Sequence, residues 1–159
     1  MDPSRASPCV FMLRVRCQAQ ASLDTKGRLM LPAPLKRAVG VHGVTQLVLA
    51  FQKGAVYGWP PAEFARLESE VEGFDPFDDE VADFVHGFLS TANDVDIDGQ
   101  GRIRVPVMLR DLAGLEREVV VNSVLNRIEI WDRETWDGRF AESLKRRATR
   151  SGLPGRGEG

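Results

Sequence analysis

Two short segments of the chain have the composition of a tight turn followed by an arginine. They are Asp24-Thr25-Lys26-Gly27-Arg28 and Asp98-Gly99-Gln100-Gly101-Arg102. In each, we expect the Asp carboxylate to accept backbone hydrogen bonds and the glycine before the arginine to adopt positive φ. A turn does not require an adjacent arginine, whereas a planar guanidinium suits phosphate groups and guanine edges. The spacing therefore favours nucleic-acid binding, the alternative being surface ion pairs with nearby carboxylates.

The two turns belong to an internal repeat. The segment Leu23–Pro32 reappears as Ile97–Pro106, an offset of 74 residues (Asp24 to Asp98). Farther on, Trp59 matches Trp131 if the second copy has lost two residues. Because only two copies exist, we expect one closed pseudo-symmetric domain and not an open solenoid.

Each copy is expected to contain the same elements in the same order: a strand after the arginine, a short helix begun by proline, and a strand pair. In the first copy these are 29–31, 33–39, 46–51 and 56–59. In the second copy they are 103–105, 107–113, 119–122 and 127–131. Gly40 and Gly114 fit the C-terminal caps of the two helices.

Between the copies the apolar residues change to helical spacing. Phe64, Leu67 and Val71 predict one helix, and an apolar stripe after the acidic Asp78–Glu80 opening predicts a second. This stripe consists of Val81, Phe84, Val85, Phe88 and Leu89, and it would either pack in the core or form an oligomer interface. A last helix carries Trp136, Phe140 and Leu144. Its basic end, at Lys145, Arg146, Arg147 and Arg150, would be a helix-dipole partner or an accessory DNA contact.

These patterns predict an α+β protein, mainly β with peripheral helices, in five segments. Residues 1–14 would be an extended or disordered N-terminus, in which Met12 is an alternative start to Met1. The first module would span 15–64, a helical connector 65–92, and the second module 93–137. The last helix and a Gly-rich tail would occupy 138–159.

Charge is segregated along the chain. Residues 1–40 hold 7 basic and 2 acidic side chains, and residues 41–99 hold 2 basic and 12 acidic ones. Residues 100–159 hold 12 basic and 9 acidic side chains. The net charge of −2 therefore does not argue against DNA, because phosphate binding depends on the local face. The acidic group Asp75, Asp78, Asp79 and Glu80 lacks the spacing of a calcium loop. We expect it to be a solvated helix start that also keeps DNA away from that face.

Several classes of function are not favoured by the sequence. Neither His42 nor His86 has a partner at a metal-ligand spacing, so we expect no metal and no cofactor. The chain has no Gly-x-Ser-x-Gly motif and no phosphate-binding loop, so we do not expect an enzyme. No apolar stretch approaches the roughly 18 residues of a membrane span. We therefore expect a cytoplasmic location without a membrane partner.

The chain resembles the MraZ family, bacterial regulators with two tandem SpoVT-AbrB-like modules. The resemblance rests on Leu23-Asp24-x-Lys26-Gly27-Arg28-x-x-x-Pro32, on Asp98-x-x-Gly101-Arg102-x-x-x-Pro106 and on Ile128-Glu129-Ile130-Trp131. It covers roughly residues 15–145. The chain departs from the family pattern at Val15-Arg16-Cys17, where Phe-Arg-Gly is usual, and at Asn122-Ser123, where the family usually has glycine in the turn.

The resemblance implies a fold of two AbrB-type swapped-hairpin modules that form one pseudo-symmetric β-barrel-like domain. It also implies a ring-shaped homo-oligomer that binds double-stranded DNA at promoter direct repeats upstream of its own division and cell-wall operon, and hence a nucleoid-associated location. The family's DNA-binding arginine falls on Arg28, with Arg102 as its equivalent in the second module, and the associated basic residue falls on Lys26. From the adjacent strands we add Arg104, Arg14 and Arg16 as expected DNA contacts. The alternative is a protein–protein scaffold in which the ring binds another regulator.

Overall fold

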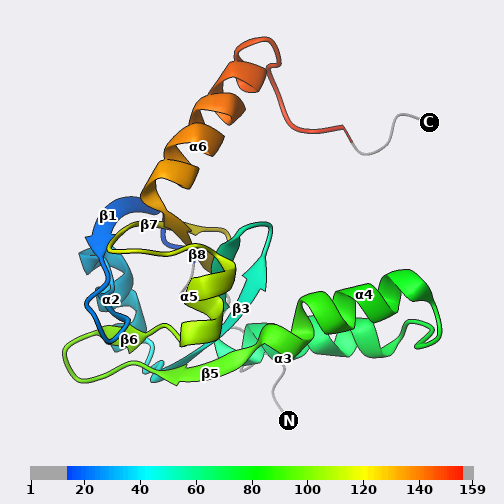
Figure 1. The fold of residues 1–159 in the computed structure, drawn as a ribbon, viewed down its shortest axis with the longest axis horizontal. Helices are drawn as coiled ribbons and strands as arrows, with labels where there is room; N and C mark the ends of the chain where they lie inside the picture. The colour runs from blue at the N-terminus through cyan, green and yellow to red at the C-terminus, as the bar shows by residue number, and fades with distance from the viewer. Residues whose placement is uncertain (1–13, 156–159) are drawn as a thin grey trace.

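The computed structural model describes residues 14–155, which form a mainly β body from which helices project (Figure 1). Its strands are β1 (Cys17–Ser22), β2 (Arg28–Met30), β3 (Gln46–Gln52), β4 (Ala55–Trp59), β5 (Asn93–Asp96), β6 (Arg102–Arg104), β7 (Glu118–Val124) and β8 (Arg127–Asp132). Its helices are α2 (Ala33–Val41), α3 (Pro61–Glu72), α4 (Asp79–Gly87), the 3₁₀ turn η2 (Leu89–Thr91), α5 (Val107–Leu112) and α6 (Arg133–Ala148). The proposed start at Met12, most of the N-terminal segment and the end of the Gly-rich tail lie outside the described residues.

The strands are arranged with pseudo-twofold symmetry. Six strands form one antiparallel sheet in the order β1-β7-β8-β4-β3-β5, and β2 and β6 form a second sheet. Equivalent residues of the two copies lie opposite each other at the centre of each sheet: Tyr57 pairs with Glu129, and Leu29 pairs with Ile103. The first strand of each copy pairs with the other copy, β1 with β7 and β5 with β3. The copies are therefore interleaved, and the prediction of one pseudo-symmetric domain is confirmed.

The expected barrel-like closure is wrong. The six-stranded sheet is open, with β1 and β5 as its edges, and β2 and β6 are joined to it through only a single bridge, Leu23 to Leu29, among the described residues. The physical reason lies in the turns. The bond from Asp24 N–H to the Arg28 carbonyl belongs to that bridge, whereas the N–H groups of Lys26 and Arg28 bond the Asp24 side chain within the turn and so cannot extend the ladder.

Both faces of the large sheet are covered by apolar side chains. On one face, Leu47 and Leu49 of β3 join a core that includes the residues of α2, α5 and the β2–β6 pair. On the other face, Val48 and Ala50 join an aromatic cluster with residues of α3 and α6. This alternation is the period-two pattern of a strand buried on both sides. The aromatic cluster consists of Tyr57, Trp59, Phe64, Phe88, Trp131 and Trp136.

One helix cap differs from the sequence prediction. Gly40 lies inside α2, and Gly43 adopts positive φ (64°) in its place. The Val44 N–H donates to the Val39 carbonyl, a bond that closes the helix end beyond the predicted position. In the second copy Gly114 adopts positive φ (61°) directly after α5, as predicted.

The apolar stripe of the connector is divided between core and surface. Phe88 is buried against Trp59, with ring centroids 5.6 Å apart, so the prediction of core packing is confirmed there. No residue of α4 itself is buried, and Val81 and Val85 remain half-exposed. Asp78 caps α4 by accepting from the backbone N–H of Glu80 and Val81, as expected for a solvated helix start.

Within residues 14–155, no helix is both long and apolar enough to cross a membrane. In the same range, no group of three or more His, Cys, Asp or Glu side chains is placed to hold a metal ion.

The packing around Gly58 gives a test of the sheet centre. A Cβ atom there would lie 2.8 Å from Leu49 Cδ2 and 2.9 Å from Ile128 Cγ1, both fully buried side chains. We expect Gly58→Ala to lower the free energy of unfolding in urea by about 1–3 kcal/mol because the core is overpacked. Gly40→Ala is the control, since nothing lies within 4 Å of its Cβ position. Equal urea midpoints for the two variants would contradict this packing.

Candidate nucleic-acid interface

The first Asp-x-x-Gly-Arg turn is held by its own carboxylate. Asp24 Oδ1 accepts from the backbone N–H groups of Lys26 and Arg28, each at 2.9 Å. Its second oxygen, Oδ2, accepts from Arg28 Nε at 2.7 Å. Gly27 adopts φ +80°, a conformation that disfavours side chains with a Cβ. One carboxylate thus both closes the turn and orients the guanidinium.

The second turn repeats this geometry. Asp98 Oδ1 accepts from the N–H groups of Gln100 and Arg102 at 2.9 Å each, and Oδ2 accepts from Arg102 Nε at 2.9 Å. Gly101 adopts φ +81°. The exposed fraction is 41% for the Arg28 side chain and 33% for that of Arg102. In each guanidinium only Nε makes a hydrogen bond within residues 14–155, so the two Nη groups remain available to a ligand.

The hydrogen bonds of the turns also hold their carboxylates ionised. The backbone N–H of Arg28, and then its side chain, lower the pKa of Asp24 to about 2. The backbone N–H of Arg102 and its side chain likewise lower the pKa of Asp98. Both ion pairs therefore persist across the whole neutral range.

The two turns are coupled to each other through β2 and β6. The Gly27 carbonyl accepts from Val105 N–H at 2.8 Å, and the Gly101 carbonyl accepts from Leu31 N–H at 3.0 Å. Arg104 Nε donates to the carbonyl of Lys26 at 3.0 Å. In the strand register Arg28 lies directly opposite Arg104. The structure therefore brings Lys26, Arg28, Arg102 and Arg104 together on one two-stranded ribbon.

Sequence reasoning did not assign a role to two basic residues beside these turns, Lys36 and Arg110. A Cβ on Gly27 would lie 2.7 Å from the Arg110 guanidinium, and one on Gly101 would lie 2.8 Å from the Lys36 side chain. Each basic side chain thus lies on the turn of the other copy, and each glycine makes room for it. The two residues occupy equivalent positions of the repeat, which was the available signal.

The first turn borders an open depression of about 730 Å³ that is rich in arginine. Its basic residues are Arg28, Arg102, Arg110 and Arg117. Its acidic residues are Asp24, which is bonded to Arg28, and Glu116. The side chains of Arg28, Arg102 and Arg110 therefore border one concave surface suited to an anionic ligand.

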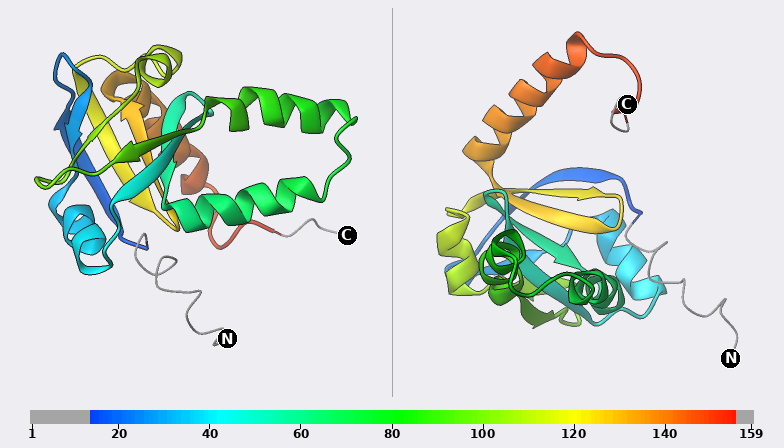
Figure 2. Two further views of the ribbon diagram at one scale, coloured as in Figure 1. Left: turned by 90° about the horizontal axis from the view of Figure 1, so that it is seen from below. Right: turned by 90° about the vertical axis from the view of Figure 1, so that its right-hand side faces the viewer.

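The structure does not bring the remaining expected contacts to this surface. Arg14 and Arg16 are exposed and precede β1. The strand runs six residues, about 20 Å at strand rise, before the first turn begins. The basic end of α6 lies at the tip of a helix that projects away from the body (Figure 2).

Comparison with known proteins adds a family match. A family profile described as "MraZ protein, putative antitoxin-like" matches residues 17–85 and 88–151. The chain is similar to the "Transcriptional regulator MraZ" of Limosilactobacillus reuteri (strain DSM 20016), at 37% identity over 77% of this chain and 84% of the relative. It is also similar to the protein of that name from Syntrophobacter fumaroxidans, at 34% identity over 79% of this chain and 83% of the relative. The protein of that name from Natranaerobius thermophilus is 36% identical over 73% of this chain and 79% of the relative.

The lowered pKa values predict how stability depends on pH. A carboxyl group with a lower pKa in the folded state stabilises the fold above its unfolded pKa, and the effect is lost as pH falls through the folded value. For Asp24 the window runs from 3.8 down to about 2. We expect the melting temperature to fall in this window, and the double variant Asp24→Asn, Asp98→Asn to fall less steeply there. Parallel pH profiles of the two proteins would contradict the assignment.

Proposed function

We propose, since this chain belongs to the MraZ family, that it is a DNA-binding transcriptional regulator whose paired turns contact DNA. The observation that carries the proposal is the β2–β6 ribbon, which places Arg28, Arg102 and Arg104 on paired strands next to the turn of Lys26, whose carbonyl accepts from Arg104. The name "Transcriptional regulator MraZ" of the relatives supports it.

The carboxylates of the turns are part of the proposed mechanism. Within each guanidinium, Asp24 or Asp98 bonds Nε, and we propose that this contact holds the guanidinium in place with its two Nη groups available to DNA. Such a pre-oriented fork binds phosphate or a guanine edge with less loss of side-chain entropy than a free arginine. On this account the ion pair does not compete with DNA but positions the DNA contact. Lys26 and Arg104 add positive charge to the same ribbon.

We further propose that the protein acts as a ring-shaped homo-oligomer on direct repeats upstream of its own operon. One ribbon is a small contact surface and should bind DNA weakly. Several subunits on successive repeats gain roughly two to four orders of magnitude in affinity without new contacts. Specificity then comes from base-edge contacts and from the match between repeat spacing and subunit spacing.

Finer features of the family assignment are also proposals. The exchange of β1 and β5 between the two copies supports a swapped-hairpin relation of two modules near 15–64 and 93–137. Because the relatives bear the name of transcriptional regulators, we propose a non-enzymatic protein located with the nucleoid.

The salt dependence of DNA binding tests the role of the turns. We expect Arg28→Ala and Arg102→Ala each to weaken binding to a duplex from upstream of the protein's own gene. Each lost phosphate contact should reduce the slope of log K against log salt by about 0.9. Fluorescence anisotropy over a salt series measures both effects.

The matched control is Arg66→Ala, which removes one positive charge from α3, far along the chain from both turns. We expect it to leave affinity and salt slope near those of the wild type. If Arg66→Ala weakened binding as much as Arg28→Ala, net charge and not the turns would govern binding. Absence of binding by the intact oligomer at low salt would instead favour the protein-scaffold alternative.

A further inference from the structure

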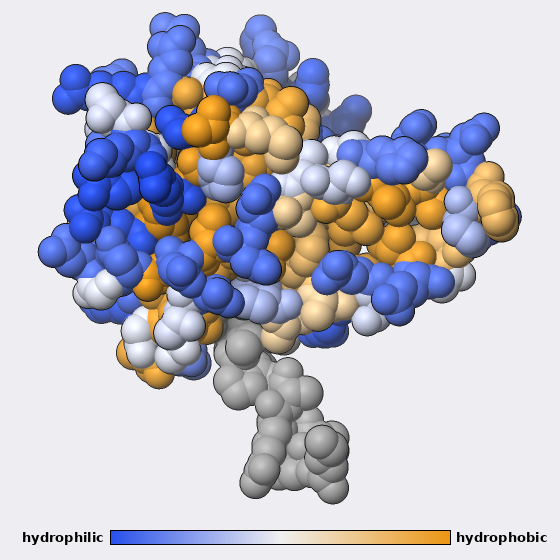
Figure 3. Space-filling model, turned by 60° about the horizontal axis from the view of Figure 1, so that its bottom comes forward, coloured by the Kyte–Doolittle hydropathy of each residue, from blue (hydrophilic) through white to orange (hydrophobic). Residues whose placement is uncertain are grey.

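Two parts of the molecule leave the body and expose apolar side chains. The first is the helical hairpin formed by α3 and α4, whose face between the helices is apolar and bordered by hydrophilic residues (Figure 3). The second is α6, every residue of which is exposed from Asp137 onward. Soluble proteins rarely leave such surfaces without a partner.

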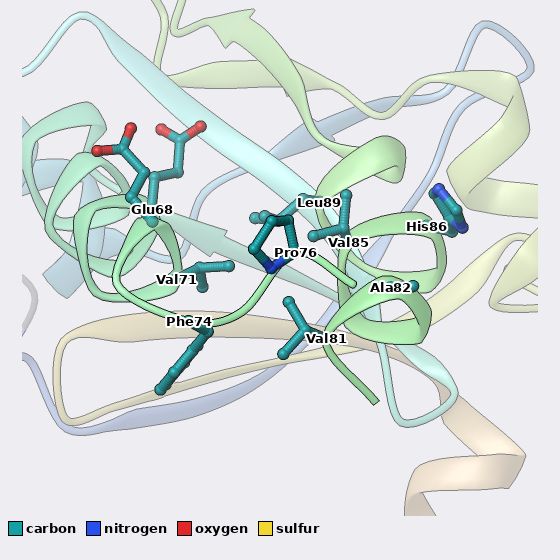
Figure 4. A pocket seen from close by; sticks show the side chains of 10 residues that line it. Glu68, Val71, Phe74, Pro76, Val81, Ala82, Val85, His86 and Leu89 are labelled. Atoms are coloured by element: carbon teal, nitrogen blue, oxygen red, sulfur yellow. The ribbon is translucent and has the colours of Figure 1, made fainter. Parts of the chain in front are cut away.

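The hairpin contains a groove that is large enough to take side chains. Two openings of about 460 and 470 Å³ reach between α3 and α4, and both are lined by Val71, Phe74 and Val81. In Figure 4, Val71 and Val85 face the space between the helices from opposite sides. We call these openings together the hairpin groove. Its borders are acidic: Glu68, Glu72, Glu70, Asp78 and Glu80.

Helix α6 has the complementary pattern. Trp136, Phe140 and Leu144 follow at four-residue spacing and form one stripe. Trp136 is buried and stacks on Phe140, with ring centroids 5.5 Å apart, so the start of the stripe is held rigidly. Leu144 is 55% exposed. Residues 133–150 hold 6 basic and 3 acidic side chains. Residues 61–87 of the hairpin hold 1 basic and 9 acidic side chains.

We propose that α6 of one subunit docks in the hairpin groove of a second copy of this chain. Apolar residues at four-residue spacing are the usual anchors of a helix in a groove, and the basic flanks of α6 match the acidic borders. The helix does not reach its own groove, because α6 and the hairpin leave the body in different directions (Figure 1 and the right view of Figure 2).

This contact is heterologous, since each subunit donates one helix and offers one groove. Repetition of such a head-to-tail contact produces a closed ring or an open filament. The inference rests on the homo-oligomer of the proposed function and names its interface.

The test uses two variants of the full chain that each disable one half of the contact. Leu144→Glu places an acid on the docking stripe, and Phe74→Glu places one in the groove. Both residues are exposed, at 55% and 58%, so both variants should fold, as circular dichroism would verify. We expect each variant alone to have the monomer mass of 17.6 kDa by sedimentation. Val41→Glu, which changes an 80% exposed apolar residue of α2, is the control and should keep the wild-type mass.

Mixing the variants gives the decisive result. The Phe74→Glu chain retains an intact α6 and the Leu144→Glu chain retains an intact groove, so an equimolar mixture should form a heterodimer of twice the monomer mass and nothing larger. A monomeric wild type, a wild-type mass in either variant, or a mixture that stays monomeric would overturn the proposal.

Binding to a duplex with a single repeat separates this proposal from the proposed function. Monomeric Leu144→Glu should bind one repeat at low salt like one wild-type subunit, while it loses tight binding to tandem repeats. Variants that keep the wild-type mass and bind DNA normally would overturn the interface alone. If the variants dissociate into monomers as expected but the wild type does not bind DNA, the interface is supported and the DNA function is contradicted.

Discussion

The mutual support of two glycine turns is the constraint on which the rest of the structure depends. Each turn offers its glycine carbonyl to the strand that follows the other turn, Gly27 to Val105 and Gly101 to Leu31. Each glycine also lies beneath a basic side chain from the opposite copy. Neither turn can be moved without the other, so the two copies fold as one unit and β2 and β6 meet at the pseudo-twofold axis.

This arrangement places like charges side by side. Arg28 and Arg104 are cross-strand partners, a pairing that ordinarily destabilises a sheet. Asp24 neutralises part of the charge, and the carbonyl of Lys26 accepts from Arg104. The remaining Nη groups still concentrate positive charge on a short ribbon, an arrangement that an anionic ligand would stabilise. The second copy contributes Arg104 where the first has Met30, so the ribbon is chemically asymmetric about its axis.

Local sequence patterns predicted most of the strands and helices. The repeat, the prolines and the period-two strands predicted β2 to β4, β6 to β8 and the intervening helices within a few residues. What they missed depends on contacts between distant segments. The role of Arg110 beside Gly27 and the bond from Arg104 to Lys26 arise from the crossing of the two copies. Strand patterns also did not show that the Asp24 side chain accepts from the N–H groups of Lys26 and Arg28, which are then not available to extend the ladder toward closure.

We propose that both turns, and not the projecting helices, contact DNA. Photo-crosslinking tests it most directly, with a benzophenone side chain placed at Thr25, at Gln100 or at Arg66, each in turn. Thr25 and Gln100 are exposed turn residues, and Arg66 lies on the acidic hairpin. We expect crosslinks to promoter DNA from Thr25 and Gln100 and none from Arg66. Crosslinks from Arg66, with none from Thr25 or Gln100, would contradict DNA contact by the turns.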